Sequence, residues 1–264
     1  MGAGDGPEDE MDEFATRYQR HLAFDRIGPE GQRRLARGSA LVVGCGALGG
    51  AAAALLVRAG VGKVRLVDCD IVELSNLPRQ LLFDEADVAA RAPKALRTAE
   101  RLRAANSACD IEPVATRIDA GTIDGLLDGI DVVVDGLDNF ATRYVVNDAC
   151  VRRGIPWVYG GVVGAAGVTM TVRPGRGPCL RCVFPEAPPE DAVPTCQTHG
   201  VVAPAPVTVA ALETIEALKL LLGRDDVRPG LLSLDLWDGS FRSVRVVRAP
   251  SCPACGSLQG YSQT

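Results

Sequence analysis

The sequence predicts an α/β protein with a doubly wound, Rossmann-like and mostly parallel sheet that carries an antiparallel extension. Three observations predict this class. The apolar run 40–43 leads into Gly44, Gly46 and Gly49, spaced as G-x-G-x-x-G, which is typical of a strand that turns tightly into a helix. Short apolar runs then alternate with helical segments, which favours parallel strands covered on both faces. Two closing strands around Asp238 and Gly239 predict the antiparallel part.

The chain begins with a strongly acidic stretch. Residues 1–13 contain six acidic residues and no basic one, and the formal net charge of the whole chain is −5. We therefore expect a disordered acidic tail at 1–13 and no nucleic-acid binding by the rest. Arginine-rich helices are expected at 14–23 and 29–36, with Gly38 as the stop signal.

The remaining elements follow from apolar periodicity. Helices are expected at 47–59, 92–105, 122–127, 141–153 and 205–222, and strands at 63–67, 111–115, 131–134, 156–159, 168–172, 231–236 and 241–247. Residues 71–87 and 173–204 lack a long apolar period and are expected to be irregular. One domain is expected at 14–264, made of a helical arm (14–38), a nucleotide-binding core (39–172), a zinc knuckle and crossover loop (173–204), and a helix, hairpin and second knuckle (205–264).

No basic segment followed by an apolar core opens the chain, so no secretion signal is expected. The uncharged stretches 40–57 and 154–172 are long enough to span a membrane, but their glycines and Pro156 favour buried strands and turns. The nine cysteines, without a secretion signal, indicate thiol or metal chemistry in a reducing compartment. We therefore expect a cytoplasmic protein without a membrane span.

The glycine pattern predicts a nucleotide site, because the N-terminus of the following helix favours an anion. A close contact between helix and strand is the alternative meaning of this pattern. The strand at 63–67 ends at Asp68, about 20 residues beyond the glycines, which is the usual spacing of a ribose-binding acid.

Polar and cationic residues follow that acid. Asn76, Arg79 and Gln80 come just after it, and Lys94 opens the next helix after Pro93. Arginine suits bidentate phosphate contacts and lysine acts as a point cation. A solvated arginine and an ordinary surface lysine are the alternatives.

Asp138 and Asn139 follow the strand at 131–134, so they lie at a carboxyl end of the sheet, where doubly wound folds bind ligands. An aspartate at this position can hold Mg²⁺ or can cap the next helix.

Two cysteine pairs predict a metal site. They are spaced as C-x-x-C, at Cys179 with Cys182 and at Cys252 with Cys255. Together they supply the four thiolates of a structural zinc site, with no position left for water. Two thiol pairs that never meet are the alternative.

Cys196 lies in the polar loop, three residues before His199. It is either a nucleophile near a base or a surface cysteine without a role.

Taken together, the motifs resemble the ThiF/MoeB family of adenylyltransferases, which is related to the activating enzymes of ubiquitin-like proteins. The resemblance covers about residues 17–256, through RYQRHL, VVGCGALG, VDCDIVELSNLPRQ, APKA, DGLDN, PCLRC, TCQTHGVVAP and CPACG. Pro78 and His199 depart from the family pattern.

The resemblance implies adenylation, with ATP, of the C-terminal glycine of a small ubiquitin-like sulfur carrier ending in Gly-Gly. It also implies a homodimer in which Arg20 reaches the partner's phosphates, Mg²⁺ on Asp138, and a transfer step at Cys196. The residues that it implies for ATP are Gly44, Gly46, Gly49, Asp68, Asp70, Asn76, Arg79, Gln80, Lys94, Asp138 and Asn139. Since the sequence ends shortly after Cys255 without a sulfurtransferase domain, a separate sulfur donor is expected.

Three alternatives stay open at this point. The substrate can be a ribosomal peptide or another carboxylate of a specialised pathway. The glycine turn can serve an NAD-dependent oxidoreductase, although that function leaves Arg79, Lys94 and the four cysteines unexplained. The fold can also belong to a catalytically silent scaffold.

Overall fold

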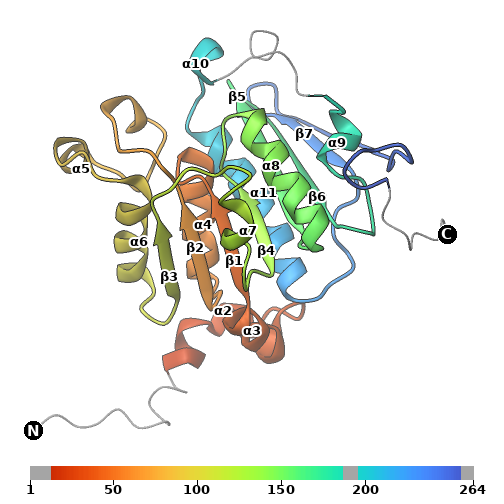
Figure 1. Cartoon of the computed structure of the whole chain (residues 1–264). Helices are drawn as coiled ribbons and strands as arrows, with labels where there is room; N and C mark the ends of the chain where they lie inside the picture. Colours follow the sequence, from red (N-terminus) through yellow and green to blue (C-terminus); the bar gives the residue numbers. More distant parts are fainter. Residues whose placement is uncertain (1–12, 187–195, 257–264) are drawn as a thin grey trace, which may run out of the picture.

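The structure, a computed structural model, describes residues 13–186 and 196–256. Most of the acidic tail expected at 1–13 and residues 187–195 of the expected crossover loop lie outside the described residues. The described chain is built around one eight-stranded sheet (Figure 1). Its strands are β1 (Ser39–Val43), β2 (Lys63–Val67), β3 (Asp110–Val114), β4 (Val132–Asp135), β5 (Trp157–Val163), β6 (Ala166–Val172), β7 (Leu231–Asp235) and β8 (Ser240–Val244).

The strand order confirms the predicted fold class. The sheet runs β3-β2-β1-β4-β5-β6-β7-β8. The first five strands pair in parallel, and β6, β7 and β8 extend the sheet in antiparallel fashion. The chain moves to one side of β1 through β2 and β3 and to the other side through β4. The carboxyl ends of β1 and β4 therefore form the switch point at which such folds bind ligands.

Helices cover both faces of the sheet. They are α2 (Gln19–Leu22), α3 (Gly28–Arg37), α4 (Ala47–Arg58), α5 (Glu85–Ala89), α6 (Lys94–Ala105), α7 (Ile123–Leu126), α8 (Phe140–Arg153), α9 (Leu180–Val183), α10 (Cys196–His199) and α11 (Pro204–Leu221). Helices α4 and α11 pack together against one face, while α8 packs with α7 and α9 on the other (Figure 1). None of the helices in the described part of the chain is long and apolar enough to cross a membrane.

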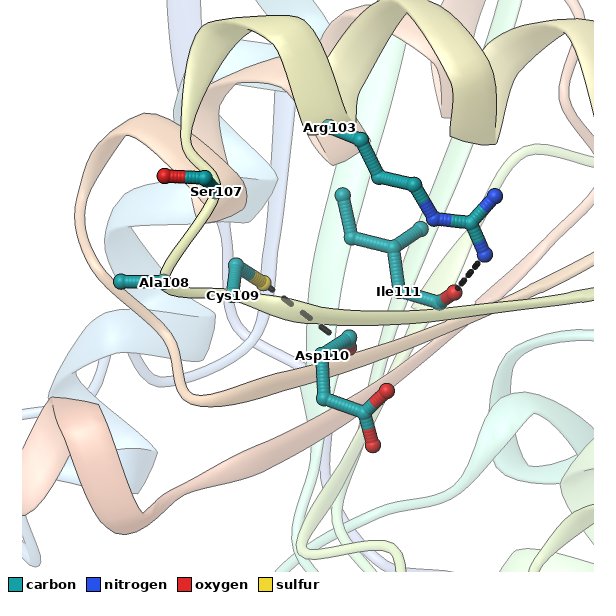
Figure 2. A pocket seen from close by; sticks show the side chains of 6 residues that line it. All are labelled: Arg103, Ser107, Ala108, Cys109, Asp110 and Ile111. Atoms are coloured by element: carbon teal, nitrogen blue, oxygen red, sulfur yellow. Dashed lines mark hydrogen bonds between the residues drawn. The ribbon is translucent and has the colours of Figure 1, made fainter.

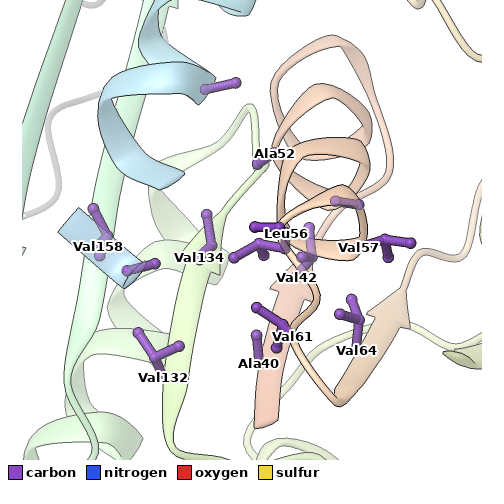
Figure 3. Packing of buried hydrophobic residues seen from close by; sticks show 14 of the residues in the cluster. Ala40, Val42, Ala52, Leu56, Val57, Val61, Val64, Val132, Val134 and Val158 are labelled. Atoms are coloured by element: carbon purple, nitrogen blue, oxygen red, sulfur yellow. The ribbon is translucent and has the colours of Figure 1, made fainter. Parts of the chain in front are cut away.

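Successive side chains of β1 point to opposite faces of the sheet, and both faces are buried. Ala40 and Val42 pack with Leu56 of α4 and Val134 of β4 on one face (Figure 3). Leu41 and Val43 belong to the other apolar cluster, which lies beneath α8. Because both faces of a central parallel strand are buried, all five residues of β1 are apolar or small.

The structure also corrects several expected boundaries. The stretch 71–87 contains the 3-10 helix η1 (Leu74–Asn76) and α5, whose first turn is closed by a capping box between Asp84 and Asp87. The loop expected at 173–204 contains α9 and α10, and the helix expected at 14–23 is interrupted at Tyr18. Helices of four or five residues are too short to show a hydrophobic period, so the sequence pattern did not indicate them.

Candidate functional site

The glycine turn presses the end of β1 against the end of β4. Gly44 has φ +91°, a conformation that favours glycine. A Cβ at Gly49 would lie 1.8 Å from the carbonyl oxygen of Gly44, and one at Gly136 would lie 2.4 Å from the same atom. A Cβ at Gly46 would meet only Nε2 of Gln80, at 3.6 Å. Close packing therefore explains Gly44, Gly49 and Gly136, while the backbone at Gly46, the residue before α4, stays approachable.

Asp68, at the end of β2, is tied to this turn. Its Oδ2 accepts a hydrogen bond from the backbone N–H of Cys45 at 2.7 Å, and its Oδ1 accepts one from that of Asp70 at 2.8 Å. Burial raises the pKa of Asp68, and the two backbone donors and Lys94 oppose that rise. The acid predicted for ribose binding therefore lies beside the glycine turn.

Lys94 joins the same edge of the sheet from the start of α6. Its Nζ lies 3.0 Å from Oδ2 of Asp70, and its backbone N–H donates to the carbonyl oxygen of Asp70 at 2.9 Å. The Lys94 side chain is 9% exposed, whereas that of Asp70 is 63% exposed. The structure thus holds a buried ammonium group next to the glycine turn.

The polar residues after Asp68 fold back over the turn. Asn76 is buried and accepts from the backbone N–H of Glu73, and Arg79 donates from Nη1 to the carbonyl oxygen of Ser75 at 2.6 Å. Gln80 is 5% exposed, and its Oε1 has no hydrogen-bond partner among the described residues. A buried amide beside Gly46 with an unpaired oxygen is a candidate ligand contact.

The side chains of Asp138 and Asn139, just after β4, make different contacts. Asn139 caps α8, because its Oδ1 accepts from the backbone N–H of Thr142 at 2.9 Å. Asp138 is exposed, and its Oδ1 accepts from Nδ2 of Asn139 at 3.3 Å. The capping role left open by the sequence therefore belongs to Asn139, and the Asp138 carboxylate remains accessible.

Sequence reasoning missed a buried ion pair beneath this turn. Nε of Arg143, in α8, lies 2.9 Å from Oδ2 of Asp135, the last residue of β4. Nη2 of Arg143 also donates to the carbonyl oxygens of Leu137 at 2.6 Å and Gly160 at 2.8 Å. We call these contacts the Arg143 clamp. It ties the turn that carries Asp138 to the middle of β5. The available signal in the sequence was an arginine among the mostly apolar residues of the helix.

The loop brings Cys196 to the same region. Its Sγ contacts the carbonyl oxygen of Val162 at 3.2 Å. Burial raises the pKa of the Cys196 thiol, the charges of Arg79 and Arg143 lower it, and that of Asp138 raises it. Cys196 thus lies within electrostatic range of the residues predicted for phosphate and magnesium, and its burial opposes ionisation of the thiol in this conformation. The ring of His199 lies against the Thr198 hydroxyl, at 2.9 Å.

The four predicted zinc ligands converge. Sγ atoms of Cys179 and Cys252 are 3.6 Å apart, those of Cys182 and Cys255 are 3.4 Å apart, and all four lie within 4.8 Å of one another. A tetrahedral Zn²⁺ with bonds of about 2.3 Å places its sulfurs about 3.8 Å apart. The thiol set therefore fits one zinc ion and joins α9 to the C-terminal segment.

Arg20 lies at the opposite end of the sheet, where the parallel strands begin. The neighbouring Tyr18 accepts a hydrogen bond from Nδ2 of Asn106, and Arg17 donates to the carbonyl oxygen of Ala105. Those contacts hold α2 at the C-terminal end of α6, one helix length away from Lys94 (Figure 1). Within one chain, the structure does not bring exposed Arg20 together with the other predicted site residues.

A hollow at that far edge contains none of the predicted residues. Figure 2 shows its lining where α6 turns into β3: Arg103, Ser107, Ala108, Cys109, Asp110 and Ile111. Nη2 of Arg103 donates to the carbonyl oxygen of Ile111 at 2.6 Å, so the arginine is already engaged. The hollow is therefore separate from the glycine turn.

The fold and the glycine turn define a Rossmann-like α/β protein of the nucleotide-binding type. Residues 18–254 match the model of the ThiF family, and the chain belongs to that family.

Two curated relatives are each 44% identical to the chain. The match to the sulfur carrier protein ThiS adenylyltransferase of Bacillus subtilis covers 91% of this chain and 71% of the relative. The match to the sulfur carrier protein adenylyltransferase of Thermus thermophilus covers 92% of each. Among solved structures, E. coli MccB with MccA-N7isoASN superposes with a TM-score of 0.78 at 23% identity, covering 92% of this chain and 75% of that one. That structure shows the likeness of fold.

Proposed function

We propose that this protein uses ATP to adenylate the C-terminal glycine carboxylate of a small ubiquitin-like sulfur carrier ending in Gly-Gly. The observation that carries the proposal is the buried ammonium group of Lys94 beside the glycine turn, in a chain that is 44% identical to named sulfur-carrier adenylyltransferases. Arg79 and Asp138 both lie within electrostatic range of Cys196, which supports placing them in the same site. Membership of the ThiF family favours this activity over a nicotinamide oxidoreductase.

The nucleotide would lie across the switch point. The glycine turn and Asp68 would bind the adenosine, with Asp70 and Asn139 at its edges. Asn76, Arg79, Gln80 and Lys94 would bind the triphosphate. The buried, unpaired oxygen of Gln80 and the open backbone at Gly46 support this placement.

The chemistry needs positive charge and positioning. The carrier carboxylate is already ionised near pH 7, so no general base has to remove a proton. One of its oxygens forms a bond to the α-phosphorus, and the bond from that phosphorus to the bridging oxygen of diphosphate breaks. The products are the acyl adenylate and pyrophosphate. Fixed cations such as Lys94 and Arg79 stabilise the negative charge that builds up on the phosphates.

Two metals belong to the proposal. The exposed carboxylate of Asp138 would hold Mg²⁺ bound to the phosphates, since Mg²⁺ in such sites is bound through one or two carboxylates plus phosphate oxygens. The four converging thiols would hold a structural Zn²⁺, because a Cys₄ shell leaves no open position for chemistry.

We further propose a homodimer in which Arg20 completes the site of the partner subunit. The family resemblance implies this homodimer, and the distance of α2 from the glycine turn of its own chain is consistent with a role for Arg20 in a partner's site. Cys196 would take part in a later acyl or sulfur transfer, with sulfur from a separate donor. The enzyme would be cytoplasmic, with residues 14–264 forming one adenylation domain.

Carrier-dependent pyrophosphate exchange tests the function. The protein is incubated with ATP, Mg²⁺, labelled pyrophosphate and candidate carriers ending in Gly-Gly, and label should enter ATP only when a carrier is present. The matched control is the same carrier without its last two glycines, which should not support exchange. If none of the candidate carriers supported exchange, the proposal would be contradicted. Exchange that depends on a peptide instead would point to the ribosomal-peptide alternative.

A further inference from the structure

Below the candidate site lies a second buried acid, which has no counter-ion of its own among the residues that the structure describes. Glu213, in α11, is 0% exposed, and neither of its carboxyl oxygens has a hydrogen-bond partner among the described residues. Glu216, three residues along the same helix, is also buried but fully engaged. Its Oε1 lies 2.8 Å from Nζ of Lys219, and its Oε2 accepts from the backbone N–H of Arg228 at 2.7 Å. The two glutamates therefore differ in charge environment, not in burial.

Glu213 and the Arg143 clamp reach the same residue from opposite faces of the sheet. A Cβ at Gly160, in β5, would lie 2.1 Å from Oε1 of Glu213, so the carboxyl group fills the space over this glycine. From the α8 side, Nη2 of Arg143 donates to the carbonyl oxygen of Gly160. The absence of a side chain at Gly160 thus makes room for Glu213.

The charges around Glu213 cannot balance a second carboxylate. The groups that face it are Asp135 from β4, Arg143 from α8 and Tyr159 from β5. Arg143 is already paired with Asp135. A second ionised carboxylate would leave one buried negative charge uncompensated, which is strongly unfavourable. Burial, and next the charge of Asp135, raise the pKa of Glu213 well above its usual range, while Arg143 opposes this rise.

We propose that Glu213 is held as a neutral carboxylic acid and acts as a positioning residue for the Arg143 clamp. As a neutral group it occupies the space over Gly160 without drawing Arg143 away from Asp135 and the Leu137 carbonyl. The clamp then fixes the turn from Leu137 to Asp138. The consequence for catalysis rests on the proposed function, whereas the neutral state of Glu213 does not.

The neutral state is tested without any substrate, by the unfolding equilibrium of the whole protein from pH 5 to pH 7. In the unfolded chain Glu213 loses its proton near pH 4.3. In the folded wild type it keeps the proton, so stability falls as pH rises through this window. Glu213→Gln cannot titrate. The unfolding constant of the wild type should therefore rise relative to that of Glu213→Gln by up to about tenfold per pH unit.

Glu216→Gln is the matched control, because it removes a buried carboxylate that has partners. It should unfold more readily than the wild type at pH 7, whereas Glu213→Gln should not. A ratio of unfolding constants between wild type and Glu213→Gln that stays constant from pH 5 to pH 7 would overturn the proposal.

The positioning role is tested by the Mg²⁺ dependence of pyrophosphate exchange. Glu213→Ala empties the space over Gly160 and should raise several-fold the Mg²⁺ concentration that gives half-maximal exchange, and Glu213→Gln should restore the wild-type value. A purely structural role would lower stability and leave this concentration unchanged, which would contradict positioning. If no carrier supports exchange, the proposed function fails, and the unfolding experiment still decides whether Glu213 is neutral.

Discussion

The buried ammonium group of Lys94 is paired with the exposed carboxylate of Asp70 at 3.0 Å. Lys94 thus carries a charge that little solvent reaches, held by a partner that solvent can reach. A buried cation interacts strongly with an incoming anion, because little water screens it. The arrangement suits an ammonium group that passes from Asp70 to a phosphate when nucleotide binds.

Lys94→Ala should lower pyrophosphate exchange about a hundred- to thousandfold, the usual effect of removing one electrostatic group from a reacting centre. The unfolding transition should remain cooperative. The control is Lys63→Ala. Lys63 is the first residue of β2, at the end of the strand opposite the glycine turn, and it pairs with Glu112. Full activity in Lys94→Ala would remove this residue from the site.

Asp138→Asn should reduce exchange by a similar factor, and part of the loss should be recovered at high Mg²⁺, because an amide oxygen is a weaker ligand than a carboxylate. Exchange is measured against Mg²⁺ concentration. Asp110→Asn, an exposed acid at the opposite edge, is the control and should keep the wild-type dependence. An unchanged Mg²⁺ dependence in Asp138→Asn would argue against metal binding there.

Arg20→Ala and Lys94→Ala should each be nearly inactive alone but should complement each other when mixed. In a mixed dimer one site contains an intact Lys94 from one subunit and an intact Arg20 from the other. Half of the dimers are mixed, each with one such site, so about a quarter of the wild-type activity should return. Subunit mixing is followed with differently tagged chains, and mixed dimers without activity would sink the shared-site model.

Cys196→Ala should leave pyrophosphate exchange close to the wild-type rate and block only a later transfer step, since adenylation needs no thiol. The rise in the pKa of Cys196 on burial supports a thiol that is not yet activated in this conformation. Cys69→Ala, which removes an exposed thiol, is the control. Both exchange and formation of the carrier thiocarboxylate are measured, and loss of exchange in Cys196→Ala would refute the division into two steps.

Removal of zinc should lower the thermal unfolding temperature without changing the turnover of the protein that remains folded. The Cys₄ set joins α9 to the C-terminal segment and includes none of the residues predicted to bind nucleotide. Metal analysis should find about one zinc per chain. Cys252→Ser should lower both zinc content and stability, and less than half an equivalent in the wild type would contradict the zinc site.

Much of the candidate site could be predicted because its signals are local. The glycine turn, Asp68 and the two cysteine pairs follow short patterns whose geometry depends on neighbouring residues. The short helices α9 and α10 could not be predicted, because four residues contain only one turn. The sequence also left open whether Asp138 caps α8 or binds Mg²⁺. Only the tertiary structure shows that Asn139 is the cap.

The sequence by itself determined the Rossmann-like class, the glycine turn and the two C-x-x-C pairs, whereas only the tertiary structure decided that the two pairs meet. These features depend on backbone freedom, apolar periodicity and spacing along the chain. Tertiary structure alone decided that Asp135, Arg143 and Glu213 all meet at Gly160, since Gly160 and Glu213 lie far from Asp135 and Arg143 in the sequence. Whether such a carboxyl group is charged depends on the water and the counter-ions that folding removes or supplies, and no local pattern records either.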